Sequence, residues 1–123
     1  MIWLSVALGG AIGACFRYAL FISVPAIAGI PFGTFVANAV GSFLMGLLAA
    51  WFRNADAWES PIRLLLLVGV LGALTTFSTF ALEAVDALRA GRVSVALAYV
   101  VGTVVITVVG CWIGYLMGQN LGR

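Results

Sequence analysis

Four long apolar stretches alternate with short polar connectors along the chain. They cover about residues 2–24, 32–52, 62–88 and 93–118. At about 1.5 Å of rise per residue in an α-helix, each stretch can cross a hydrocarbon core about 30 Å thick. The pattern predicts an all-α protein, a single domain over residues 1–123 built from four transmembrane helices.

The connectors carry helix-breaking and polar residues. Pro25 and Pro31 follow the first stretch, a polar segment at residues 53–61 follows the second, and Arg89-Ala90-Gly91-Arg92 follows the third. No basic segment precedes the first stretch, so we expect it to remain as a helix instead of being cleaved as a signal peptide. The aromatic residues near predicted helix ends, where interfacial aromatic side chains concentrate, are Trp3, Trp51, Trp58 and Tyr115.

Glycines recur at helical spacing in two of the stretches. Gly110, Gly114 and Gly118 share one face of the fourth, and Gly9 and Gly13 share a face of the first. Such ridges of small residues let helices approach closely in lipid. They predict tight packing and carry no information about a substrate.

The composition agrees with a lipid environment. Hydrophobic residues make up 64% of the chain and charged residues 8%, whereas soluble domains carry about 25% charged residues. The net charge of +2 is too small for a nucleic-acid-binding surface. The chain has no His and no cluster of Cys with carboxylates, which argues against a metalloenzyme, and we find no nucleophile–base pair. Cys15 and Cys111 both lie in apolar stretches. They are predicted to be buried free thiols, although a disulfide between them is also possible.

The positive charges hardly specify the orientation of the chain in the membrane. Four spans place both termini on one side with Arg53, Arg63 and Arg123, and the other side carries Arg89 and Arg92, with Arg17 near that end of the first helix. With three arginines on each side, the positive-inside rule hardly favours either orientation. The chain is therefore predicted to insert both ways, although a weak bias can also suffice for one orientation.

Two polar residues deep in the first two helices have alternative explanations. Arg17 either extends to the membrane interface or attracts an anion in a vestibule. Asn38 offers two donors and an acceptor, which suit either an interhelical hydrogen bond or an NH₂ donor to a permeating anion. The other polar residues at depth outside the third helix are Ser42, Thr103 and Thr107.

The third stretch departs most from an apolar helix, over the interval from Gly72 to Phe80. Residues 69–80 hold two glycines and four hydroxyl residues at mid-membrane depth. They indicate either a glycine kink with hydroxyls bonded back to the backbone, or a helix break that offers carbonyls to a cation and a helix N-terminus to an anion. Phe77 and Phe80 share a face and either pack in the ordinary way or point their electropositive ring edges into a pore.

Three segments together resemble the CrcB/Fluc fluoride channel family. They are GGAIGACFRY at residues 9–18, GTFVANAVGSF at residues 33–43 and GVLGALTTFSTF at residues 69–80, which includes TFSTF. With four spans and a matching length, the resemblance covers nearly the whole chain. It implies an antiparallel, dual-topology homodimer with a broken third helix and two fluoride pathways, in the bacterial cytoplasmic (inner) membrane.

The resemblance also implies a role for particular residues. Backbone carbonyls of Gly72 and Thr75 would hold a structural Na⁺ shared by both subunits at the dimer centre. Cys111 stands where a hydroxyl residue is expected. The fluoride pathway would comprise two phenylalanine ring edges, an amide donor, a polar track with a nearby carboxylate, a hydroxyl of the fourth helix and a vestibule arginine: Phe77, Phe80, Asn38, Ser78, Thr79, Glu83, Thr107 and Arg17.

The implied function is passive, fluoride-selective export that lowers cytoplasmic fluoride. Hydroxyl, amide and ring-edge donors can replace the water around a small anion without a fixed cation that would hold it too tightly. One alternative is a small multidrug-resistance-type exporter, but such exporters depend on a carboxylate in the first helix, which here has none. The other is a non-transporting membrane anchor subunit, which would explain the glycine ridges but not the clustered donors.

Overall fold

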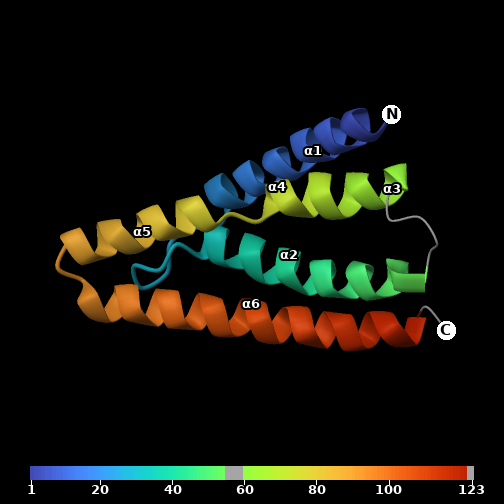
Figure 1. Cartoon of the computed structure of the whole chain (residues 1–123). Helices are drawn as coiled ribbons and strands as arrows, with labels where there is room; N and C mark the ends of the chain where they lie inside the picture. The colour runs from blue at the N-terminus through green and yellow to red at the C-terminus, as the bar shows by residue number, and fades with distance from the viewer. Residues whose placement is uncertain (55–59, 122–123) are drawn as a thin grey trace.

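The computed structural model describes residues 1–54 and 60–121, and within them the chain forms helices joined by short connectors (Figure 1). Trp58 and Arg123, named above as an interfacial aromatic residue and a charge at the terminal side, lie outside the described residues. The elements are α1 (Ile2–Ser23), α2 (Phe32–Trp51), η1 (Phe52–Asn54), α3 (Pro61–Arg63), η2 (Leu64–Leu71), α4 (Gly72–Leu74), α5 (Phe77–Arg89) and α6 (Val93–Leu121).

Four helical segments among the described residues are long and apolar enough to span a membrane. They are Ile2–Ser23, Phe32–Trp51, Pro61–Arg89 and Val93–Leu121. The fourth helical segment continues to Leu121, three residues beyond its predicted end at residue 118. Part of the third span, η2, is a π-helix, in which the bonds run from residue i to residue i+5.

The spans form an elongated bundle in which α2 lies between α6 and the third span (Figure 1). α6 packs along α2, and α1 packs along η2 and α4. The start of α1, the end of α2 and the end of α6 lie at one end of the bundle, and the turn between α5 and α6 lies at the other. This alternation is the up-and-down path expected of four successive membrane crossings.

Glycines allow the close contacts within these pairs. A methyl group added at Gly114 or Gly118 would collide with the carbonyl oxygen of Phe43 or Leu47 on α2. Gly110 differs from its two ridge partners, because a methyl group there would meet nothing closer than 3.9 Å. Where α1 meets η2, a methyl group at Gly69 would lie 2.7 Å from the Cα atom of Gly9. The predicted tight packing is present, but Gly110 does not take part in it within the protomer.

The turn after α5 ends the helix with a glycine in the left-handed region. Gly91 has φ of 72°. The N–H of Gly91 donates to the Leu88 carbonyl at 3.0 Å, and the N–H of Arg92 donates to the Ala87 carbonyl at 2.9 Å. These bonds form a Schellman motif, which satisfies carbonyls at the end of α5 and reverses the chain into α6.

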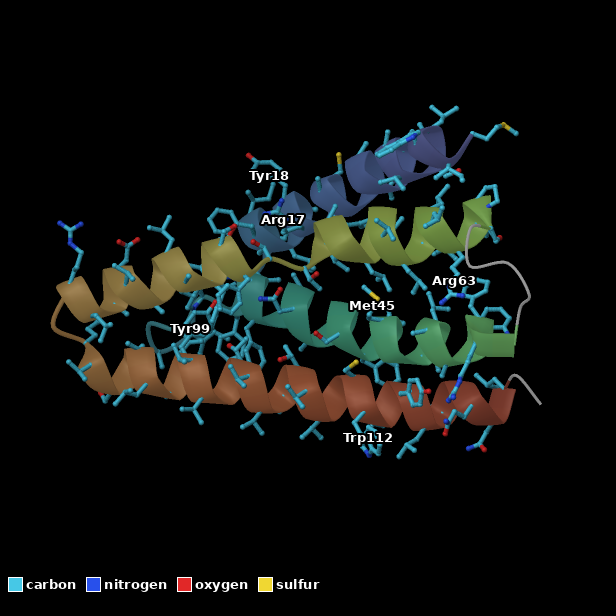
Figure 2. The ribbon with its side chains drawn as sticks, in the orientation of Figure 1. Arg17, Tyr18, Met45, Arg63, Tyr99 and Trp112 are labelled. Atoms are coloured by element: carbon cyan, nitrogen blue, oxygen red, sulfur yellow. The ribbon has the colours of Figure 1, made fainter. Side chains whose placement is uncertain are left out.

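Few large apolar side chains are buried inside the protomer. One small core consists of Ala37 with Leu67, Leu71 and Leu74, and a second of Phe80, Ala84 and Tyr99. Most other large apolar side chains face outward, as Trp112 does in Figure 2. Helices that are hydrophobic all round suit lipid or a further protein surface, not water.

Candidate functional site

The third span is interrupted at Thr75 and Thr76. Thr75 has φ, ψ of −80°, 151° and Thr76 has −150°, 122°, both extended, so α4 ends at Leu74 and α5 begins at Phe77. The break is narrower than the predicted interval and does not begin at Gly72, whose φ, ψ of −64°, −33° are helical. The Thr76 side chain accepts a hydrogen bond from the N–H of Thr79 at 3.2 Å and so caps α5.

Asn38 on α2 bonds to both backbone groups of Thr76. The Thr76 N–H donates to Asn38 Oδ1 at 2.7 Å, and Asn38 Nδ2 donates to the Thr76 carbonyl at 3.0 Å. The pair replaces bonds that a continuous helix would have made, which matches the interhelical explanation of Asn38. Its amide nitrogen carries a second hydrogen, and the residue also lines a cavity, so the donor role remains compatible with this geometry.

The break releases several carbonyls from their helical donors, including those of Gly72 and Thr75. In a continuous helix, Gly72 would accept from the N–H of Thr76 and Thr75 from the N–H of Thr79. Those two N–H groups donate instead to Asn38 Oδ1 and to Thr76 Oγ1. The neighbouring carbonyl of Leu71 keeps its helical donor, the N–H of Thr75, at 3.1 Å. Gly72 and Thr75, the two residues predicted to hold a cation, are thus among the residues around the break whose carbonyls have lost their helical donors.

An open cavity of about 500 Å³ lies beside the break, between the third span and α6. Phe77 is 78% exposed and Phe80 only 5%. Their ring centroids lie 5.5 Å apart with the ring planes tilted by 52°, and Phe80 also packs 5.1 Å from Tyr99. The cavity brings together six predicted residues: Asn38, Gly72, Thr75, Phe77, Phe80 and Thr107.

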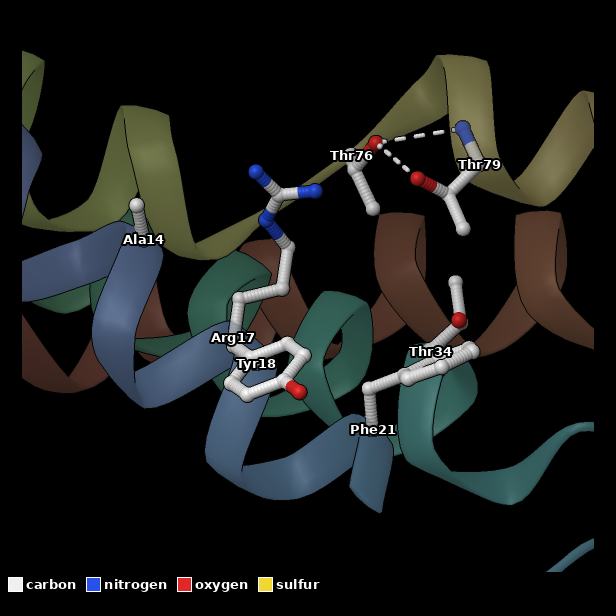
Figure 3. Close-up of a pocket in the computed structure, with 7 residues that line it drawn as sticks. All are labelled: Ala14, Arg17, Tyr18, Phe21, Thr34, Thr76 and Thr79. Atoms are coloured by element: carbon white, nitrogen blue, oxygen red, sulfur yellow. Dashed lines mark hydrogen bonds between the residues drawn. The ribbon is translucent and has the colours of Figure 1, made fainter.

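Arg17 lies beside a second, smaller cavity of about 260 Å³ (Figure 3). Its Nε donates to the carbonyl of Ala73 at 3.0 Å, at the end of α4. Thr76 Oγ1 and Thr79 Oγ1 lie 3.1 Å apart on the wall of the same cavity. Arg17 is therefore held at the level of the break instead of extending to the interface, and it does not count toward the charge of either end.

Ser78 and Glu83 lie apart from the cavity that holds the phenylalanines. Ser78 is exposed, with its Oγ 3.3 Å from Thr76 Oγ1. Glu83 accepts a hydrogen bond at 2.8 Å from the hydroxyl of Thr34 and another at 2.7 Å from that of Tyr99, which points toward α5 in Figure 2. The carboxylate thus joins α2, α5 and α6.

Sequence reasoning missed Thr34 and Tyr99. Both carried a signal in their spacing, because residues four apart share a helix face. Thr34 is four residues before Asn38, and Tyr99 is followed at that spacing by Thr103 and Thr107. Cys15 and Cys111 are free thiols, as predicted, but Cys15 is exposed and Cys111 only partly buried.

Comparison with known proteins gives consistent matches. A profile of the family described as "CrcB-like protein, Camphor Resistance (CrcB)" matches residues 4–115. A protein of Novosphingobium aromaticivorans named "Fluoride-specific ion channel FluC" is 46% identical over 113 residues, which cover 89% of each chain. A protein of the same name from Aquifex aeolicus is 41% identical over 95% of this chain and 96% of its own, and one from Thermus thermophilus is 41% identical over 97% and 94%.

Proposed function

This chain belongs to the CrcB family, and from that membership we propose that it is a fluoride-selective ion channel. It is a multi-pass protein of the bacterial inner membrane, and it transports instead of catalysing a reaction. The observation that carries the proposal is the broken third span, which gathers an amide donor, two phenylalanine rings and a helix N-terminus around one cavity in a chain similar to fluoride channels. The chain exports fluoride passively and lowers its cytoplasmic concentration.

The chemistry around the cavity favours a small anion. α5 begins inside the span, and the start of a helix carries partial positive charge and free N–H groups. The amide of Asn38 and the ring edges of Phe77 and Phe80 add donors without a full charge. Glu83 is bonded to Thr34 and Tyr99 and does not line this cavity, so its negative charge is kept from the ion.

Hydroxyls and Arg17 continue the pathway in this proposal. Thr76, Thr79 and Ser78 form a short run of hydroxyls at the start of α5. The positive charge of Arg17 lies next to that run and raises the local concentration of anions. Fluoride leaves the cell without a coupled substrate, because the membrane potential drives an anion outward.

The working unit of the proposal is an antiparallel, dual-topology homodimer. Support comes from the open side of the cavity, where Phe77 and Gly72 are exposed although they lie at mid-span. A second copy would cover these residues and close two pathways. Among the described arginines, Arg53 and Arg63 lie at one end and Arg89 and Arg92 at the other, an even distribution that suits insertion in both orientations.

A structural Na⁺ at the dimer centre belongs to the same proposal. Gly72 and Thr75 would hold it through their backbone carbonyls, both of which have lost their helical donors. Unwound backbone is a common source of oxygen ligands for Na⁺ in membrane proteins. The positive charge of the bound ion would link the two copies. Gly72 and Thr75 both line the open cavity where a second copy would pack.

Ion efflux from liposomes that contain the purified protein tests the proposal. We expect fluoride to leave much faster than chloride, and Phe77→Ile to lower fluoride efflux at least about tenfold, equivalent to about 1.4 kcal/mol, because isoleucine has no ring edge. Phe16→Ile is the control, since Phe16 is an exposed residue of α1 outside this cavity. Equal fluoride and chloride rates in the unmodified protein would rule out the fluoride channel.

The same assay separates the sodium proposal from the channel proposal. Protein equilibrated in a Na⁺-free buffer with N-methyl-D-glucamine should lose most of its fluoride efflux and regain it when Na⁺ is returned. Full efflux after exhaustive Na⁺ removal would eliminate the Na⁺ site and leave the fluoride channel standing.

A further inference from the structure

Two cavities of the protomer meet near the end of α1. One is the cavity of about 260 Å³ beside Arg17, and the other, of about 360 Å³, lies beside the connector between α1 and α2. Among the described residues, Phe21 of α1 and Thr34 of α2 are the two that line both cavities, and Figure 3 shows both on the wall of the first. The side chains of Phe21 and Thr34 therefore form the boundary between the two cavities.

An arginine and a carboxylate lie in these neighbouring cavities without forming an ion pair. Arg17 lines the first cavity, and within residues 1–54 and 60–121 its guanidinium bonds through Nε to the Ala73 carbonyl, while Nη1 and Nη2 have no partner. Glu83 lines the second cavity and accepts the Thr34 hydroxyl at 2.8 Å, so its carboxylate lies directly behind the boundary. Opposite charges attract strongly where water is scarce, so a physical barrier is needed to keep them apart.

Phe21 and Thr34 differ in how firmly they are held at the boundary. Thr34 is 3% exposed and is fixed by its bond to Glu83. The backbone of Phe21 contacts α2, because a methyl group added at Gly33 would lie 2.9 Å from the Phe21 Cα atom. The side chain of Phe21, in contrast, is 54% exposed. The apolar ring is thus the part of the boundary that a substitution can remove while the contact between the two helices stays in place.

We propose that the ring of Phe21 keeps Arg17 from pairing with Glu83, so that the guanidinium stays available to fluoride. The inference rests on the proposed function and names a positioning residue, since Phe21 acts on the ion through Arg17. Without the ring, the boundary is open on its α1 side, and the free Nη donors of Arg17 can turn toward the carboxylate. A paired guanidinium loses those donors and most of its positive field, and anions no longer collect beside it.

Fluoride efflux from liposomes that contain the full chain tests the inference. Phe21→Ala removes the ring and should lower efflux about fivefold or more, because a neutralised arginine no longer concentrates anions. Phe21→Leu keeps a bulky apolar side chain at the boundary and should retain most of the efflux. Ile22→Ala is the matched control and should leave efflux nearly unchanged, because Ile22 is an exposed neighbour that lines the second cavity but not the first.

A double-mutant cycle identifies the charge through which the ring acts. Glu83→Gln keeps the shape of the side chain and removes its charge. In the Glu83→Gln background, Phe21→Ala should lower efflux by less than about twofold, because no carboxylate remains to pair with Arg17. A ring that serves only in packing would give the same fold loss in both backgrounds. Size-exclusion chromatography in detergent reports whether each variant assembles like the unmodified protein.

Four results would overturn the inference: unchanged efflux in Phe21→Ala, an equal fold loss with and without the Glu83 charge, a loss in Ile22→Ala as large as in Phe21→Ala, or a Phe21→Ala chain that no longer assembles. The last result would assign the ring to packing. If the unmodified protein itself does not prefer fluoride over chloride, the proposed function fails, and the inference fails with it. A selective protein with an unaffected Phe21→Ala variant refutes the inference alone.

Discussion

At the scale of single residues, the side chain of Asn38 stabilises a backbone conformation 38 positions away. It accepts from the N–H of Thr76 and donates to the carbonyl of Thr76, and it is itself 8% exposed. Leaving both backbone groups unpaired in an apolar environment costs about 1–3 kcal/mol for each group. The break therefore depends on α2 as much as on the local sequence of the third span.

Asn38→Leu should destabilise the protein by about 2 kcal/mol or more, because it leaves both groups of Thr76 without partners. Thermal unfolding in detergent measures the loss, and hydrogen exchange at the Thr76 amide should become faster. Asn120→Leu is the matched control, since Asn120 is exposed at the end of α6 and its side chain donates to the Leu116 carbonyl of the same helix at 3.2 Å. Equal melting temperatures for the two variants would contradict this role for Asn38.

Sequence reasoning found most of the candidate residues but not their partners. The hydroxyls and glycines of residues 69–80 mark a departure from an apolar helix, because lipid favours aliphatic side chains there. The exact position of the break was beyond that reasoning, since extended Thr76 bonds to Asn38, a residue of another helix. The same holds for Arg17, whose two expected roles did not include a bond to the Ala73 carbonyl.

At the scale of elements, α2 and α6 pack closely because glycines replace side chains at defined points. Gly46 faces the carbonyl of Cys111, and Gly114 and Gly118 face carbonyls of α2. Backbones this close gain dispersion contacts that substitute for the hydrophobic effect, which does not operate between helices in lipid. The hydrophobic pattern predicted the helices, but the π-helical bonding of η2 leaves no mark in composition.

Gly114→Ala should weaken the α2–α6 pair by about 1–3 kcal/mol, because the new methyl group collides with the Phe43 carbonyl. Gly110→Ala, one turn earlier on the same face, should be neutral or stabilising, since alanine favours a helix and its methyl group meets only ordinary contacts at 3.9 Å. The temperature of unfolding in detergent distinguishes the two. A loss in Gly110→Ala as large as in Gly114→Ala would show that a different surface packs on this ridge.

At the scale of the whole molecule, the even distribution of the arginines supports the proposal of dual topology. Two described arginines lie near each end, and Arg17 is held at the break between them. At the end that carries the α5–α6 turn, the Arg92 guanidinium lies over Gly29, where a methyl group would come within 2.7 Å of Nη1. Because the arginines near the two ends are equal in number, small changes in charge at one end should decide the orientation in which the chain inserts.

A C-terminal reporter that works only in the cytoplasm and another that works only outside it should both be active on the unmodified chain. Ala90→Lys with Ser94→Lys should hold the α5–α6 end in the cytoplasm, because positive loops stay inside. The outer reporter then dominates, and fluoride efflux falls as antiparallel partners disappear. Ala90→Gln with Ser94→Gln is the uncharged control. Activity of only one reporter on the unmodified chain would exclude dual topology.

The bond between Asn38 and Thr76 also has a consequence for the order in which the protein is made. Asn38 precedes Thr76 in the chain, so a ribosome delivers α2 to the membrane before it delivers the segment that α2 completes. The Asn38 amide is therefore already in the membrane when the third span inserts. The N–H and the carbonyl of Thr76 can bond to it at once and do not stay unpaired in lipid until a later helix arrives. If the asparagine were on α6, the third span would enter the bilayer with the N–H and the carbonyl of Thr76 unpaired.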